Sequence, residues 1–313
     1  MNRVIVLVLT SMLLCAAPAS AETGTSASGA SGTAAQAPPA TPDPVAGRLR
    51  TIRYGIESEL LELFKSLAAE KESRYDAEIL ALLGSSTSPR LRLAALDLFR
   101  SLSWDGAEEE ALRIVEGRDG ENPQVVAAAL GYLAEIRSKK ALDFAKAIID
   151  ENDKTLLGPL VTLLGRAGSD KEEAILLAWL ESDTPSPALR ESSIKALGDI
   201  GSGKAGEKLV AILDNASAPR FERVFAAEAI AKIGWNKGLP SLVKAANGED
   251  TTVQAAAVEA LGSFEGAESD TALIEALRSS YAKSRIAACK AIAKRKLLLA
   301  LPNLEYKVTS DPD

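Results

Sequence analysis

The stretch Ala-Leu-Gly-Asp-Ile-Gly at residues 196–201 recurs in altered form as Ala-Ile-Ala-Lys-Ile-Gly at 229–234 and as Ala-Leu-Gly-Ser-Phe-Glu at 260–265. When the second residue of each stretch is taken as an anchor, apolar residues occupy equivalent positions at steps of 31–35 along the chain. These anchors are Phe64, Phe99, Leu133, Leu164, Leu197, Ile230, Leu261 and Ile292. A fixed period of this length indicates a repeat architecture.

Two further columns place each anchor on a helix. Three residues after the anchor the chain is apolar in every unit except the last, which has Arg295. Four residues before the anchor it is mostly Ala. Offsets of −4, 0 and +3 share one helix face, and small residues there let a neighbouring helix approach closely. We therefore expect the anchor segment of each unit to be an amphipathic helix.

A second helix follows each anchor helix after a polar or Gly-containing break. Leucine stands twelve residues after the anchor in the last five units, and Pro240 and Pro302 fit the first turn of this second helix. Aromatic residues make up only 4% of the chain, which favours helix over strand. The prediction is an all-α, right-handed α-solenoid (superhelix) of about eight helix pairs.

The motif of residues 187–201, Pro-Ala-Leu-Arg-Glu-Ser-Ser-Ile-Lys-Ala-Leu-Gly-Asp-Ile-Gly, resembles the short HEAT-like repeats of the phycobilisome-lyase type. The segments Leu-Pro-Ser-Leu at 239–242 and Leu-Pro-Asn-Leu at 301–304 match the second helix of that pattern. The arginine of the motif is present only as Arg92, Arg190, Arg223 and Arg285, so half of the units depart from it. The resemblance implies a HEAT-repeat fold over most of residues 48–308 and assigns no functional residue.

The first 47 residues differ in composition from the repeats. A basic start, an apolar run over 4–17 and the small residues 19–21 predict a signal peptide, residues 1–21, cleaved after Ala21. Residues 22–47 are rich in Ala, Ser, Gly and Pro and predict a disordered linker. The solenoid is expected over 48–308 and a C-terminal tail over 309–313.

The signal places the protein outside the cytoplasm, in the periplasm, the cell envelope or the extracellular space. A retained N-terminal anchor is the alternative to cleavage, although the apolar run is shorter than the about 20 residues of a membrane span. Lipidation at Cys15 is not expected, because Leu14 stands where a lipobox requires a small residue.

The amino-acid composition excludes many enzyme mechanisms. The chain has no histidine, so a His general base, a Ser-His-Asp triad and a His-ligated metal are excluded. Its net charge of −7 disfavours nucleic-acid binding. We expect no catalytic, metal-binding or cofactor-binding residue, and an inert thiol at Cys289.

Three segments invite a functional interpretation. Residues 198–205 approach a phosphate-binding loop, but Ala205 replaces the required hydroxyl and a helix precedes the loop, so we expect an inter-helix turn. Pro159 lies inside an anchor helix and should kink it. The tryptophans, Trp104, Trp179 and Trp235, are expected to pack between units.

Charge is distributed unevenly. Residues 105–121 carry seven acidic residues against two arginines, whereas residues 281–308 carry seven basic residues against Glu305. The candidate partner-binding residues are the basic cluster Lys290, Lys294, Arg295 and Lys296. Such a cluster can attract an acidic partner or anionic lipid, and the alternative is a polar cap on the end of the solenoid.

The preferred functional hypothesis is an exported, non-enzymatic scaffold or adaptor that binds a protein partner through the solenoid surface. The alternatives are a lyase-like enzyme subunit or cofactor-attachment accessory protein, by fold analogy alone, and an envelope protein associated with anionic membrane surfaces. The identity of the partner and the oligomeric state are left open by the sequence.

Overall fold

The computed structural model describes residues 43–181 and 186–311. They belong to one compact unit, Asp43–Asp313, and every element within the described ranges is an α-helix or a short 3-10 helix. The predicted signal peptide and residues 22–42 of the predicted linker lie outside the described residues. The all-α prediction is confirmed for the part that the structure describes.

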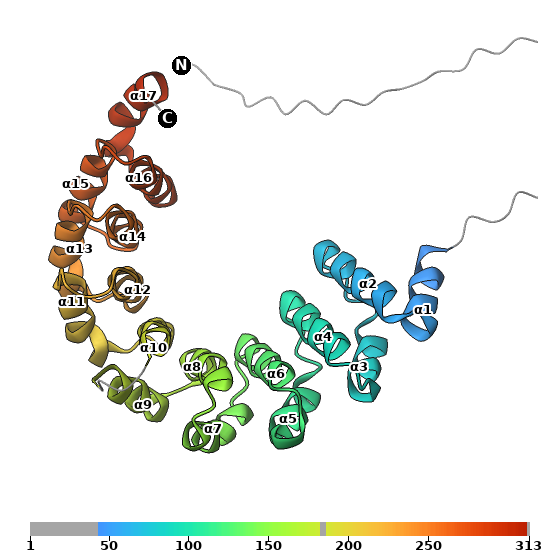
Figure 1. Cartoon of the computed structure of the whole chain (residues 1–313). Helices are drawn as coiled ribbons and strands as arrows, with labels where there is room; N and C mark the ends of the chain where they lie inside the picture. The colour runs from blue at the N-terminus through green and yellow to red at the C-terminus, as the bar shows by residue number, and fades with distance from the viewer. Residues whose placement is uncertain (1–42, 182–185, 312–313) are drawn as a thin grey trace, which may run out of the picture. The chain divides into compact units, whose positions relative to one another are not determined.

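Eight helix pairs follow one another along the described chain, and Figure 1 shows them as two rows. The first helices of the pairs, each containing one anchor, form one row: α2 (Glu57–Glu70), α4 (Pro89–Leu102), α6 (Pro123–Glu135), α8 (Lys154–Ala167), α10 (Pro187–Ile200), α12 (Arg220–Ile233), α14 (Thr251–Leu261) and α16 (Ala282–Arg295).

The second helices form the other row. They are α3 (Asp76–Ser85), α5 (Glu108–Glu116), α7 (Ala145–Glu151), α9 (Asp170–Glu181), α11 (Gly206–Asp214), α13 (Leu239–Ala246), α15 (Ala267–Ala276) and α17 (Leu301–Ser310). Short 3-10 turns enter several of them: η2 (Lys140–Phe144), η3 (Gly203–Ala205), η4 (Asn236–Gly238) and η5 (Leu298–Ala300), while η1 (Arg118–Gly120) precedes α6. Each first helix packs on the first helix of the next pair, which is the neighbour-to-neighbour packing of an α-solenoid.

Capping residues fix where the first helices begin and end. Side chains of Ser88, Asn122 and Ser186 accept hydrogen bonds from backbone N–H groups at the starts of α4, α6 and α10, and a proline follows each of them. At the opposite ends of α10 and α12, Gly201 and Gly234 take positive φ angles of 78° and 68°. In each case the glycine in the left-handed conformation ends the first helix and turns the chain toward the second helix.

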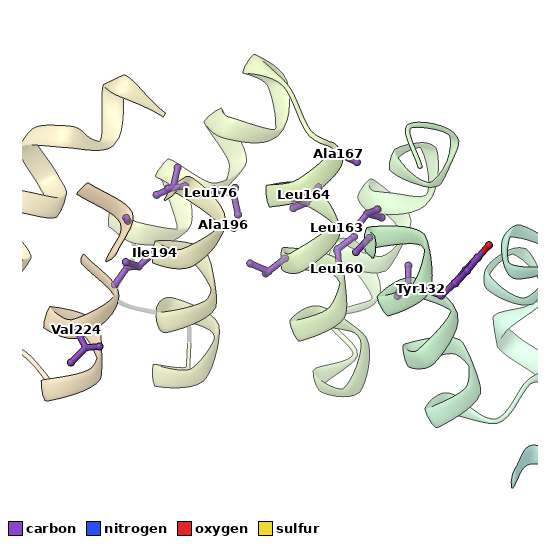
Figure 2. Close-up of a cluster of buried hydrophobic side chains, with 14 of the residues drawn as sticks. Tyr132, Leu160, Leu163, Leu164, Ala167, Leu176, Ile194, Ala196 and Val224 are labelled. Carbon is purple, nitrogen blue, oxygen red and sulfur yellow. The ribbon is translucent and has the colours of Figure 1, made fainter. Parts of the chain in front are cut away.

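The core is continuous from pair to pair. All eight anchors are buried, and Leu197, Ile230 and Leu261 have no exposed surface. The column four residues before the anchor is also buried in every unit. Figure 2 shows the middle of this core, where Leu160 and Leu164 of α8 lie between side chains of α6 and α10. Each pair therefore shelters its apolar face against its neighbours, as the repeat pattern predicts.

Small residues bring the first helices close together. A Cβ added at Gly165 would lie 2.7 Å from the Cα of Ala196, and one at Gly198 would lie 2.9 Å from the Cα of Ala229. These glycines stand one residue after their anchors, and the facing alanines stand one residue before theirs. The +1 and −1 columns are therefore where two successive first helices make their closest approach.

The helical array extends beyond both predicted ends of the solenoid. Helix α1 (Pro44–Tyr54) begins inside the segment predicted as linker, because the Asp43 carboxylate accepts from the Val45 N–H and Pro44 occupies the first turn. Helix α17 continues to Ser310, and Asp311 beyond it contacts Arg285 at 2.8 Å. Capping by a single Asp-Pro pair, in a segment without apolar periodicity, explains why the linker prediction overran to residue 47.

Proline at position 159 is accommodated within a helix. The helix α8 runs through it from Lys154 to Ala167 without interruption. Leu160 directly after it is fully buried. Pro159 is thus part of one continuous α-helix, and the kink expected there stays a prediction.

Candidate partner-binding site

The last helix pair contains the predicted basic cluster. Helix α16 ends where Lys296 adopts a positive φ of 53° and the Leu297 N–H donates to the Ile292 carbonyl. The turn η5 then leads into α17, which has Pro302 in its first turn. This geometry repeats that of earlier pairs, but no further pair follows within the described chain.

An open groove runs between α16 and α17, with a volume of about 600 Å³. Its floor is largely apolar and includes Ile286, Cys289 and Ala293 from α16 and Leu304 and Val308 from α17. Ile286 is 52% exposed and Val308 is 87% exposed. Helix α17 has no buried residue at all. The expectation of a polar cap at this end is therefore wrong, because the last pair exposes apolar side chains.

The four predicted partner-binding residues have different surroundings. Lys290, Lys294 and Lys296 are exposed, and no hydrogen bond or ion pair involves their side chains among the described residues. Lys290 also lines the groove. Arg295 instead donates to the Ser269 Oγ at 3.1 Å and forms an ion pair with Asp270. Lys290 and Lys294 are thus available to a partner, whereas Arg295 joins α16 to the preceding pair.

The remaining charges of the groove are engaged locally. Arg285, whose side chain is 7% exposed, pairs with Asp311 at 2.8 Å and donates to the Ser279 carbonyl at 3.0 Å. Lys307 lies 3.4 Å from the same carboxylate. Burial raises the pKa of the Cys289 thiol, and the negative charge of Asp311 raises it further. Lys290 is therefore the exposed, unpaired basic residue that lines the groove, Lys294 lies one turn further along α16, and the thiol of the groove is weakly reactive.

The acidic segment 105–121 is largely used within the fold. Lys140 pairs with both Glu108, at 3.2 Å, and Glu109, at 2.5 Å. Glu121 pairs with Arg92. These pairs join neighbouring units, and similar pairs between neighbours recur along the described chain. Three of the seven acidic residues of this segment therefore pair between units, and Glu110 pairs with Arg113 on its own helix.

The loop resembling a phosphate-binding motif is a turn between α10 and α11, as expected. Gly201 provides the left-handed residue, and the Ser202 Oγ accepts from the Ala205 N–H at 3.1 Å. Lys204 is paired with Glu173 at 2.5 Å. The lysine is therefore bound to the preceding pair, and the backbone N–H groups that would surround a phosphate are partly occupied.

Two further observations concern the described residues. No group of three or more Asp, Glu, Cys or His side chains lies within reach of one metal ion there. None of the helices in residues 43–181 and 186–311 has the length and apolar content needed to cross a membrane.

Aromatic packing between units is observed for one tryptophan, and one exposed pair was missed. Trp235 covers Gly206 of the preceding pair, as predicted, whereas Trp104 packs on Phe99 of its own unit with ring centroids 4.8 Å apart. On α12, Phe221 is 54% exposed and stacks on Phe225, over which the Lys195 ammonium lies at 3.5 Å. Five residues before the anchor, most other units have Ala, Ser or Pro, so Phe225 was the available signal.

The apolar groove was not predicted, although it follows from columns that the sequence displays. Leu304 and Val308 stand at positions that most earlier units fill with apolar residues, and no ninth anchor helix lies among the described residues to cover them.

Comparison with known proteins agrees with this architecture. A family model described as spirochaete HEAT repeat protein matches residues 52–313. Among solved structures, the complex of CpcE and CpcF of phycocyanin lyase from Nostoc sp. PCC7120 matches with a TM-score of 0.52 and 16% identity, covering 84% of this chain and 99% of that chain. A designed armadillo repeat protein matches with a TM-score of 0.29 and 16% identity, over 79% and 98% of the two chains. A search of curated protein sequences gave no match.

Proposed function

The chain belongs to the spirochaete HEAT repeat proteins, and we propose that it is an exported, non-enzymatic scaffold that binds a protein partner through its solenoid surface. Family and fold leave the function open, since solenoids of this kind serve different activities. The proposal therefore depends on the surface of this chain.

One observation carries the proposal: the last helix pair leaves uncovered an apolar groove of about 600 Å³. Contiguous exposed apolar surface on a soluble protein is typical of a protein or membrane interaction site. Here Ile286, Val308 and Tyr306 are each more than half exposed on the last pair. Burying such side chains in a partner is favourable by roughly 1.5–3 kcal/mol for each large residue.

The arrangement of charged residues supports a binding role over catalysis. Acid–base chemistry requires titratable groups that converge on a substrate. Glu173 and Glu222 are almost fully buried, yet they pair with Lys204 and Arg190 of the next and preceding pairs. These groups stabilise the stacking of units and are directed into the fold, so the surface is suited to recognition.

The test is affinity capture of the tagged full chain from the envelope fraction of the source cells after mild crosslinking, read by mass spectrometry. We expect one protein to be recovered in near-equal amount and to be crosslinked to the solenoid. Recovery of only abundant contaminants under gentle conditions would contradict the scaffold proposal. Export is tested separately: the N-terminal residue of the mature protein in that fraction is expected to be Glu22.

A lyase-like subunit remains the alternative function, because the phycocyanin lyase complex shares the fold. At 16% identity this likeness concerns the fold alone. Incubation of the purified protein with free tetrapyrroles, followed by absorption spectroscopy, separates the two. The scaffold proposal predicts no spectral change, whereas a stable red or blue shift would favour a role in cofactor attachment.

A further inference from the structure

We infer that the groove between α16 and α17 docks an amphipathic helix of another protein, with small residues on its contact face and a carboxylate opposite Lys294, in the place that a ninth first helix would occupy. The inference rests on the proposed protein-binding function and specifies the site and the chemistry of the partner. Three properties of the repeat, compared between the last pair and its predecessors, lead to it.

The first property is burial. Twelve residues after the anchor, each earlier unit has a buried side chain: Asp76, Ala111, Ala145, Leu176, Leu209, Leu242 and Leu273. Leu304 holds this position in the last unit and is partly exposed. Sixteen residues after the anchor, Leu213 and Leu277 are 1% exposed, whereas Val308 is 87% exposed. The groove is thus the surface that earlier pairs cover with their successors.

The second property is the close approach of first helices. Gly165, Gly198 and Gly262, one residue after their anchors, face the alanines 196, 229 and 291 of the next first helix. Ala293 stands at this position in α16 and is exposed in the wall of the groove. A helix seated like its predecessors must therefore present Ala, Gly or Ser to Ala293, since a larger residue would hold it away.

The third property is charge two residues after the anchor. There, Glu135 of α6 pairs with Arg166 of α8, and Asp199 of α10 pairs with Lys232 of α12 at 2.6 Å. Side chains in this column therefore meet those of the same column in the next first helix. Lys294 holds the position in α16 and has no ion pair among the described residues. The docking helix is thus expected to carry Asp or Glu at its own +2 position.

Arg285, one of the basic residues that line the groove, does not require the partner. In an earlier pair, Arg190 reaches forward to Glu222 of the next first helix at 3.0 Å. The equivalent Arg285 reaches Asp311 of its own chain. Asp311 thus takes the role of a carboxylate from a successor, and the open charge is left at the Lys294 end.

Electrostatics disfavours a second copy of this chain as the occupant. The outermost helix at the N-terminal end, α1, carries Arg48, Arg50 and Arg53 and no acidic residue. Head-to-tail contact would bring these arginines to Lys290 and Lys294, and tail-to-tail contact would oppose two sets of lysines.

Cys289 provides a reporter inside the groove. It is the only cysteine of the described residues and is partly buried. The probe is a side-chain-stapled helix with the sequence of residues 187–200, which presents Ala at its −1 position and Asp at its +2 position. A matched probe replaces that Asp by Lys. The readout is the rate of thiol labelling at Cys289 of the full chain, measured by peptide mass spectrometry.

The acidic probe is expected to slow Cys289 labelling saturably, and the Lys probe is expected to bind roughly fivefold more weakly, the effect of one surface ion pair. Lys294→Glu should reverse this preference. The control Lys146→Glu, an exposed lysine on α7, should leave it unchanged. Val308→Asp should weaken both probes more than about tenfold without altering the circular dichroism spectrum, because Val308 is solvent-exposed.

Two outcomes would overturn the inference. One is unchanged labelling at saturating acidic probe, or equal binding of both probes. The other is protection of Cys289 by vesicles of anionic lipid but not by the acidic probe, which would assign the groove to a membrane surface. The broader proposal fails separately: a captured partner that is retained by Val308→Asp contradicts the groove but preserves the scaffold, whereas the absence of any partner contradicts the scaffold.

Discussion

Removing one buried carboxylate should stabilise the N-terminal end of the solenoid. Asp76 begins α3 at the position twelve residues after the anchor, where the last five units have leucine. It is 4% exposed, and neither carboxylate oxygen has a hydrogen-bond partner among the described residues. Burial, with a smaller contribution from the negative charge of Glu72, raises the pKa of Asp76 to about 6.

The size of the effect follows from linkage. A pKa of about 6 in the folded state, against an ordinary value of 3.8, means that the folded chain holds this proton more tightly than the unfolded chain. The free energy of unfolding therefore falls as Asp76 ionises between about pH 4 and about pH 6, and this loss is complete above that range. Two units of pKa correspond to about 3 kcal/mol. Asp76→Asn should raise the free energy of unfolding by about 2–3 kcal/mol at pH 7.5 and by little at pH 4.

The assay is urea unfolding of the full chain and of Asp76→Asn between pH 4 and pH 8, followed by circular dichroism. Hydrogen exchange of α1 to α3 should accompany it, because solenoid ends open independently of the rest. Asp143→Asn, a change at an exposed carboxylate on η2, serves as control and should shift the unfolding free energy by less than about 0.5 kcal/mol. Equal stability of Asp76→Asn and the unaltered chain at pH 7.5, in both measurements, would refute the argument.

Four other substitutions test the packing and the turns. Gly198→Ala should lower the unfolding free energy by about 1–3 kcal/mol, because the added Cβ meets Ala229. Gly47→Ala, where the added Cβ enters open space, should raise the unfolding free energy by about 0.5–1 kcal/mol in the same denaturation assay. Tyr132→Phe should lower the free energy of unfolding by about 1–3 kcal/mol. The lost hydroxyl donates to the Trp104 carbonyl at 2.8 Å and accepts from the Ala107 N–H at 3.1 Å. Lys296→Gly should raise the thermal midpoint slightly, because a left-handed residue with a Cβ ends α16; a lowered midpoint would contradict that reading.

The repeat could be predicted because its signal is redundant. Anchors such as Leu197 and Ile230 recur with apolar and small residues on the same face, so several columns agree on the helices and on burial. The start of α1 could not be predicted in this way. It depends on the local capping of Pro44 by Asp43, and a single helix outside the array has no repeat partner to reveal it.

The candidate site was predicted only in part. A count of basic residues identified Lys290 and Lys294 correctly as exposed charges, but it cannot distinguish them from Arg295, because pairing with Asp270 depends on which residues the α15 and α16 helices bring together. Likewise, Asp76 occupies a column in which apolar residues dominate, and sequence does not reveal that its carboxylate lacks a partner. Such features depend on three-dimensional neighbours rather than on periodicity.

The neighbour-only packing of the first helices bears on how the gene can change. The helix α8, for example, contacts the second helices α7 and α9 and the neighbouring first helices α6 and α10, all of them in its own or an adjacent pair. Recombination within the coding sequence could therefore insert or delete whole units in the middle without redesigning either extremity. Appending a unit after α17 would be different, because the helices of the added unit would pack on Val308 and the residues around it. Variation in the number of units is therefore expected in the interior of the array rather than next to the last described pair.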